Sequence, residues 1–346
     1  MSHRGDLTPH LSSRAKRGDL TVNKNKPLLL YLLAAACLAA FLVYKLVPSG
    51  ESAGLEMRAR DASRLMARAS AAIRECRLAR GVPIDPVSDP NRTGLIGLKT
   101  SPITTSLGSL EAKRTATNPA WAGLVVRLFD QAGARPGGAV AVGASSSFPG
   151  LIIAVLAACR ASGLTPLVIS SLGSSQWGAN VPEFNWWDME DCLNASGVLS
   201  IRPLAYSLGG DEDKAADMSP EGRALILGQA ARHGASLLEE ADLARTVAAR
   251  MKLYEQAAAG RPIAAFINIG GSWVNLGVDS RVLEVKPGLS MKGGPSEITE
   301  FPAPDRSGMI HAWARRGVPV IHLLFVKGLC AAHGLPWDPQ PLPAVR

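Results

Sequence analysis

Three segments rich in glycine and serine contain the residues of this sequence best suited to holding a ligand. They read "VGASSSFPG" (142–150), "VISSLGSSQWGAN" (168–180) and "INIGGSWVNLG" (267–277), and each includes the end of a short apolar run. Glycine lets a backbone approach a ligand closely, and serine hydroxyls together with helix N-terminal amides can hold a carboxylate or a phosphate. The candidate ligand-binding residues are Ser145, Ser146, Ser147, Ser174, Ser175, Gly270, Gly271 and Ser272.

The serine run at 145–147 has two other interpretations. One serine could cap the N-terminus of the helix expected from Pro149, which is compatible with ligand binding. A serine nucleophile is the second alternative, although "GASSSFPG" lacks the G-x-S-x-G spacing of a nucleophile elbow. Its general base would be a histidine oriented by Asp188 or Asp191, and the candidates are His233, His311, His322 and His333. The sequence assigns no catalytic residue and leaves open whether the protein is an enzyme.

Cofactor and metal motifs are absent from the sequence. There is no P-loop, and "NIGGSWVNLG" does not have the G-x-G-x-x-G spacing of dinucleotide-binding proteins. The acidic run "GGDEDKAAD" (209–217) lacks the full calcium-loop spacing, so we expect a solvated loop there, and we predict neither a cofactor nor a metal ion. The cysteines form no C-x-x-C pair or disulfide framework, and they are expected to be mostly buried thiols: Cys37, Cys76, Cys159, Cys192 and Cys330.

Short apolar runs alternate with helical stretches, which is typical of α/β proteins. Strands are expected at 139–142, 167–170, 201–204, 263–269 and 318–322. Helices are expected at 119–132, 149–162, 186–195, 221–233, 239–259, 307–316 and 324–333. Because the strands are almost continuously apolar, we predict a doubly wound, mostly parallel sheet with helices on both faces. Ligands bind beyond the carboxyl ends of the strands in such sheets, so the three Gly/Ser segments are expected along one edge.

The N-terminal part of the chain predicts a membrane anchor. Residues 1–27 form a basic tail and precede a run without charged residues from Leu28 to Tyr44. A helix of about 20 residues spans a bilayer, so we predict a single transmembrane helix at 28–47, with Lys45 reaching the interface. A cleaved signal peptide is the alternative, but no good A-x-A site follows the apolar run. Basic residues flank both ends, with slightly more before the run, which favours a cytoplasmic N-terminus and an extracytoplasmic folded domain.

The remaining chain divides into a stalk helix at 48–82, an α/β domain at 83–335 and a Pro-rich tail at 336–346. The stalk helix has an apolar face and, opposite it, a face rich in arginine. The arginine-rich face could contact lipid headgroups or a partner, or it could be solvated while the apolar face packs on the domain. The apolar face comprises Leu55, Leu65, Met66, Ala69, Ile73 and Leu78. The net charge is +8, but no basic face interleaved with aromatic residues is present, so nucleic-acid binding is not expected.

Beyond these patterns, the chain resembles the poly-gamma-glutamate system protein family. The resemblance rests on the single N-terminal anchor and on three segments, "GVPIDPVSDPNRTGLIG" (81–97), "ITTSLGSLEAKRTATNPAWAGLVVRLFDQAG" (103–133) and "INIGGSWVNLG" (267–277), and it extends over almost the whole chain. It implies a membrane-associated accessory protein that acts with poly-gamma-glutamate synthase and export components in the cell envelope. It supplies no catalytic residues.

This resemblance agrees with the candidate site, because poly-gamma-glutamate is an anionic polymer. The Gly/Ser segments could hold its carboxylates, helped by Arg114, Lys286 or Lys292. The expected partners are therefore the membrane, the other synthase and export components, and the polymer itself. The alternative function is a membrane-anchored serine hydrolase or transferase that acts on the polymer or on cell-wall peptides.

Overall fold

The computed structural model describes residues 26–46 and 50–345. Most of the basic tail expected at 1–27, and the start of the expected stalk at 48–82, lie outside the described residues. The chain forms two units, Met1–Glu51 and Ser52–Arg346.

The first unit contains helix α1, Lys26–Leu46. Within the described residues, none of the helices has both the length and the apolar character that crossing a membrane requires. The structure therefore gives no support to the transmembrane helix expected at 28–47.

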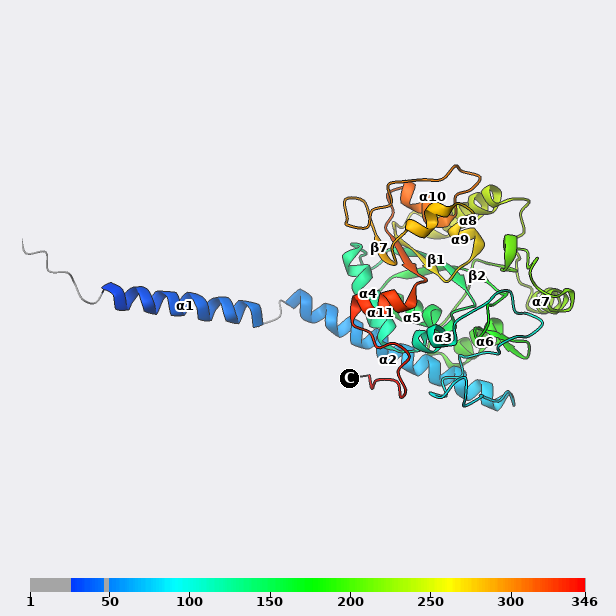
Figure 1. Cartoon of the computed structure of the whole chain (residues 1–346), viewed down its shortest axis with the longest axis horizontal. Coiled ribbons are helices and arrows are strands. Elements are labelled where there is room, and N and C mark those ends of the chain that lie inside the picture. Colours follow the sequence, from blue (N-terminus) through cyan, green and yellow to red (C-terminus); the bar gives the residue numbers. More distant parts are fainter. Residues whose placement is uncertain (1–25, 47–49, 346) are drawn as a thin grey trace, which may run out of the picture. The chain divides into compact units, whose positions relative to one another are not determined.

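The second unit is built on a six-stranded sheet, which confirms the mixed α/β fold (Figure 1). The strand order is β5-β2-β1-β6-β8-β7, and all neighbours are parallel except β7, which runs antiparallel to β8 at the edge. The strands are β1 (Ala139–Ser145), β2 (Thr165–Ser171), β5 (Ala205–Ser207), β6 (Ile263–Ile269), β7 (Gly288–Ser290) and β8 (Val320–Leu323). The strand that follows β1 in the chain, β2, lies on one side of β1, whereas β6 lies on the other side. The strand order therefore reverses between β1 and β6, and α/β proteins commonly bind ligands at such a point.

Helices cover both faces of this sheet, as expected. Val140 and Val142 of β1 belong to one apolar cluster, whereas Ala139 and Ala141 belong to another on the opposite face. Helices α2 (Gly50–Ala79), α4 (Ala120–Gln131) and α5 (Pro149–Ala161) contribute to the first cluster, and α8 (Leu243–Ala258) and α10 (Met309–Arg315) contribute to the second. The other helices are α3 (Leu110–Ala116), α6 (Trp186–Ser196), α7 (Pro220–His233), α9 (Trp273–Leu276) and α11 (Val326–His333), and a short hairpin joins β3 (Asn180–Val181) to β4 (Phe184–Asn185).

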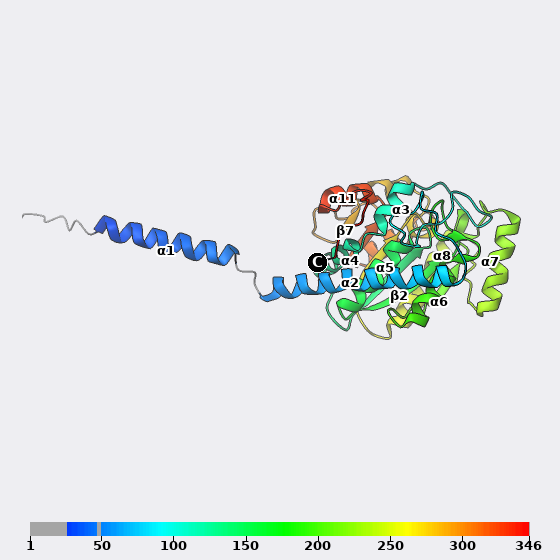
Figure 2. The same ribbon diagram turned by 90° about the horizontal axis from the view of Figure 1, so that it is seen from below.

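The long helix α2 is part of the core of the second unit, along which it runs in Figure 2. Gly123 of α4 allows the close approach of the two helices, because a Cβ there would lie 3.0 Å from Ser63 Oγ and 3.1 Å from Ala59 O. Leu78, expected on the apolar face, is instead 46% exposed. The buried apolar residues of α2 are Ala59, Ala62, Met66, Ala69 and Ile73.

A disulfide joins Cys76 of α2 to Cys192 of α6, with 5.9 Å between the Cα atoms. The cysteine spacing does not reveal this bond, since the two residues are separated by 116 positions. Cys159 and Cys330 are buried free thiols, as expected, but this expectation is wrong for Cys37, which is exposed, and for Cys76 and Cys192, which form the disulfide.

One expected strand is misplaced. The sequence predicts a strand at 201–204, but β5 begins at Ala205. The Asn194 side chain instead forms hydrogen bonds with both backbone groups of Ile201. It donates to the Ile201 carbonyl (3.1 Å) and accepts from the Ile201 N–H (2.8 Å). Both polar groups are thus satisfied without a neighbouring strand.

Candidate functional site

A cavity of about 600 Å³ opens at the carboxyl ends of β1, β2 and β6, where the sequence places the three Gly/Ser segments. Ser145, Ser171 and Gly271 line it at the ends of these strands. Five of the eight candidate residues line the cavity, namely Ser145, Ser147, Ser175, Gly271 and Ser272. The volume is within the range of about 300–1,000 Å³ that is typical of small-molecule sites.

Ser146 and Ser174 do not line the cavity but join the loops after β1 and β2. Ser146 Oγ lies 2.9 Å from the Leu172 carbonyl and 3.0 Å from the Gly173 carbonyl. Ser174 Oγ lies 3.1 Å from the Ser175 carbonyl and 3.4 Å from the Ser146 carbonyl. Both hydroxyls are therefore buried structural groups rather than ligand donors.

The serine run does not cap helix α5, so the capping interpretation is wrong. Phe148 occupies the N-cap position without a side-chain cap, and Pro149 begins the helix. Ser147 instead connects the loop after β1 to the loop after β2, because its Oγ accepts from the Ser175 N–H at 2.9 Å. Pro149, at the start of the helix, has no N–H, so the helix start has one unpaired donor fewer.

Gly270, the remaining candidate, positions the loop after β6 against the loop after β1. Its φ is +81°, and a Cβ there would lie 3.1 Å from Ser145 Cβ and 3.3 Å from the Phe148 ring. Only glycine combines this backbone conformation with so close an approach. The role of Gly270 is thus to shape the cavity.

Lys113 of α3 is the site residue that sequence reasoning missed. Helix α3 is capped by Ser109, whose hydroxyl accepts from the Ala112 N–H at 3.2 Å. Lys113 is only 4% exposed, yet it lines the cavity. Its Nζ donates to the Ser147 carbonyl at 2.6 Å, lies 2.8 Å from Ser175 Oγ, and stands 3.6 Å from the centre of the Phe148 ring.

Burial lowers the pKa of Lys113 to about 7. The cause is the cost of placing an ammonium away from water without a countercharge. None of the described carboxylates forms an ion pair with Lys113, although Asp211 and Asp217 line the same cavity. Lys113 therefore exists as a mixture of charged and neutral forms near neutral pH.

The cations expected to help are not in this cavity. Arg114, the neighbour of Lys113, forms a two-fold ion pair with Asp338, with distances of 2.7 and 2.5 Å. Lys286 and Lys292 line two other cavities, formed by the 281–300 and 290–318 segments. The pattern of a serine cap followed by a short helix is the sequence signal that could have directed attention to α3.

The acidic run 209–217 is not simply a solvated loop, because Asp213 is buried. Asp213 Oδ2 accepts from Arg250 at 2.6 Å, and its Oδ1 accepts from Ser207 Oγ at 2.8 Å. Glu212 and Asp213 adopt positive φ values of 52° and 59°, in the left-handed region. In the same run, Asp211 and Asp217 line the cavity.

The histidines offer no general base for the cavity serines. His322 Nδ1 lies 2.9 Å from Asn268 Nδ2, and burial lowers the pKa of His322 to about 4. His311 is fully buried, neither ring nitrogen has a hydrogen-bond partner, and burial, followed by repulsion from Arg315, lowers its pKa to about 4. Across residues 26–46 and 50–345, no histidine forms a hydrogen bond with a serine.

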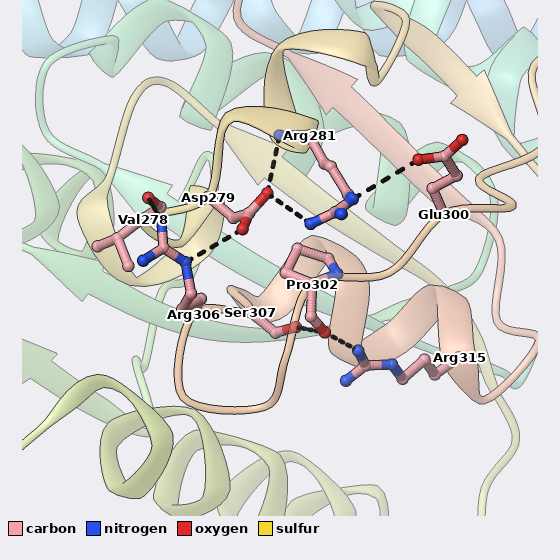
Figure 3. Close-up of polar contacts among 8 residues, drawn as sticks. All are labelled: Val278, Asp279, Arg281, Glu300, Pro302, Arg306, Ser307 and Arg315. Carbon is pink, nitrogen blue, oxygen red and sulfur yellow. Dashed lines mark hydrogen bonds and ion pairs between the residues drawn. The ribbon is translucent and has the colours of Figure 1, made fainter.

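The polar groups preceding and following His311 are engaged with one another (Figure 3). Asp279 accepts from Arg281 and Arg306, both at 3.1 Å, while Arg281 also pairs with Glu300. The Pro302 carbonyl accepts from Ser307 Oγ and from Arg315. This network ties the 278–315 segment together.

No family model, no curated protein and no solved structure was found to match this chain.

Proposed function

We propose that the cavity binds a carboxylate-bearing unit of an anionic polymer, and that the protein is an accessory of poly-gamma-glutamate synthesis or export. The observation that carries this proposal is the buried Lys113 side chain, which lines a cavity otherwise rich in serine hydroxyls at the carboxyl ends of parallel strands. Hydroxyls and a partly desolvated cation are the groups that stabilise a bound carboxylate.

Lys113 would act on such a ligand through Ser175. When Lys113 is charged, it donates to Ser175 Oγ, so the Ser175 hydroxyl hydrogen is free to point to the ligand. A carboxylate near this pair stabilises the charged form of Lys113 and raises its pKa. The cavity volume of about 600 Å³ suits a chain end or a short stretch of the polymer.

The location at the membrane is part of the same proposal. The sequence supports a single anchor at 28–47 with the N-terminus in the cytoplasm, and the resemblance supports partners among the synthase and export components. The Cys76–Cys192 disulfide supports an extracytoplasmic domain, because disulfides persist in oxidising compartments and are rare in the cytosol of mesophiles.

Calorimetric titration of the full-length protein with short gamma-glutamyl oligomers tests the binding function. At pH 6.5 we expect Lys113→Met to weaken binding by about 10- to 100-fold. This factor corresponds to the free energy of one charge-assisted hydrogen bond. Gamma-linked oligomers that carry amides in place of the free carboxylates should bind as weakly to the wild type. Lys252→Met is the matched control, because Lys252 is exposed on α8 and does not line this cavity.

Equal affinity of Lys113→Met and the wild type for the oligomers would contradict the proposal. Undiminished binding of the amide oligomers would do the same, since the ligand would then be recognised without its charge.

A further inference from the structure

The Lys113 amine has a fixed orientation. Apart from its own carbon chain, the nitrogen contacts three groups, which are the Ser147 carbonyl, the Phe148 ring and Ser175 Oγ. The carbonyl and the ring face can only accept a hydrogen. In the neutral amine, the two N–H groups therefore go to these two partners, and the nitrogen lone pair faces the Ser175 hydroxyl at 2.8 Å.

Ser175 is held in place but remains accessible from the cavity. Its backbone N–H donates to Ser147 Oγ at 2.9 Å, and the residue lines the cavity although it is 6% exposed. Gly108 lies over the pair, and a Cβ there would stand 3.3 Å from both Ser175 Oγ and Lys113 Cε. The absence of a side chain at Gly108 leaves the hydroxyl open.

From this geometry we infer that Ser175 and Lys113 are a nucleophile and its general base, and that they transfer acyl groups from amides or esters held in the cavity. The inference rests on the proposed function, because it places the reaction on a ligand bound in the same site. It differs from the Ser–His arrangement considered for the sequence, since the base is a lysine on a separate helix.

The reaction needs only water or an amine as co-reactant. Ser175 Oγ attacks the carbonyl carbon while the Lys113 lone pair takes the hydroxyl proton. The tetrahedral intermediate collapses, the bond to the leaving amine or alkoxide breaks, and the leaving group takes the proton from Lys113. A water molecule or a second amine then attacks the ester on Ser175, giving its proton to Lys113, which returns it to Ser175 Oγ.

The electrostatics of the site agree with this role. A general base works best when its pKa is near the working pH, and burial brings the pKa of Lys113 to about 7.

The first test uses p-nitrophenyl acetate with the full-length protein. We expect a burst of about one equivalent of p-nitrophenolate and an acetyl group on Ser175, located by peptide mass spectrometry. The acylation rate should rise about tenfold per pH unit below pH 7 and level off above it, because only neutral Lys113 is a base. This pH profile needs no variant and so does not depend on a variant folding.

Two substitutions separate chemistry from binding. Ser175→Ala and Lys113→Arg should each lower the burst rate by about 10²- to 10⁴-fold, because arginine keeps the charge but cannot act as a base. Lys113→Arg should retain binding of gamma-glutamyl oligomers. Ser170→Ala is the matched control, since Ser170 is buried on β2, has no hydrogen-bond partner and does not line the cavity.

Absence of a burst, an acetyl group on another residue, or a burst that survives Ser175→Ala would overturn the nucleophile–base pair. If the oligomers still bind in that case, the proposed binding function stands alone. A Ser175 burst without oligomer binding would support the pair and remove the proposed function.

Discussion

The Arg250 guanidinium lies 2.6 Å from Asp213 Oδ2, with both side chains buried, and this ion pair connects helix α8 to the loop that follows β5. Ser207 Oγ completes the contact, because it accepts from Arg250 at 2.8 Å and donates to Asp213. The same loop brings Asp211 and Asp217 to the cavity. The buried ion pair thus lies outside the cavity, at the same loop that brings these two carboxylates to it.

Arg250→Met should lower the free energy of unfolding by about 3–5 kcal/mol, because it leaves the Asp213 carboxylate buried and unpaired. Urea unfolding measures the change. The double variant Arg250→Met/Asp213→Leu should recover most of the loss, since it removes both charges. Arg245→Met, which breaks an exposed ion pair with Asp242 on the same helix, is the control and should cost about 1 kcal/mol or less.

Carboxylate binding and acyl transfer should depend on pH in opposite directions. A bound anion favours charged Lys113, so the affinity for gamma-glutamyl oligomers should fall as pH rises above about 7, the pKa of Lys113. Titrations between pH 6 and pH 9 should show this fall together with proton uptake on binding. Lys113→Arg should remove the dependence, and a wild-type affinity that is constant over this range would contradict the assignment of Lys113 as the binding cation.

The stability of the protein should also depend on the ionisation of Lys113. The folded-state pKa is about 7 and the ordinary value is 10.5, so between these values the unfolded chain binds the extra proton. Stability therefore rises with pH across this window, by up to about 1.4 kcal/mol per unit. Unfolding of the wild type should show this slope relative to Lys113→Met, and parallel curves for the two proteins would contradict it.

His311→Phe should leave the protein as stable at pH 7, or make it more stable, because the imidazole nitrogens are buried without partners. The pKa of His311 is about 4 when folded and 6.5 ordinarily, so the wild type should lose stability as pH falls from 6.5 to 4. Thermal unfolding at several pH values measures the difference. An unchanged acid sensitivity in His311→Phe would show that other groups cause it.

The double variant Cys76→Ser/Cys192→Ser should lower the free energy of unfolding by about 2–5 kcal/mol, as expected for a disulfide that closes a long loop. Chemical unfolding, with thiol titration to confirm the oxidation state, measures the change. Cys37→Ser should have no effect on this transition, because Cys37 is exposed. A wild-type protein isolated from its native cells with both thiols free would contradict the proposed extracytoplasmic domain.

The sheet and the place of the cavity could be predicted from the sequence, whereas the cation in the cavity could not. Apolar runs locate β6 at its observed bounds and β1 and β2 closely, and parallel strands place their following loops at one edge. The same reasoning does not identify Lys113, because α3 is too short to show a clear periodicity of apolar residues. Its burial depends on the distant residues Ser147, Phe148 and Ser175, and nothing local distinguishes it from a surface lysine.

The Cys76–Cys192 bond also determines which parts of the chain can carry mechanical tension. A pull between the two ends of the chain would pass through α2 as far as Cys76, cross the disulfide, and continue from Cys192. Residues 77–191 form a covalently closed loop outside this path, and they include Lys113, Ser147 and Ser175. Such a pull could therefore not extend residues 77–191 even after the non-covalent contacts of the fold had opened, because the disulfide bypasses them.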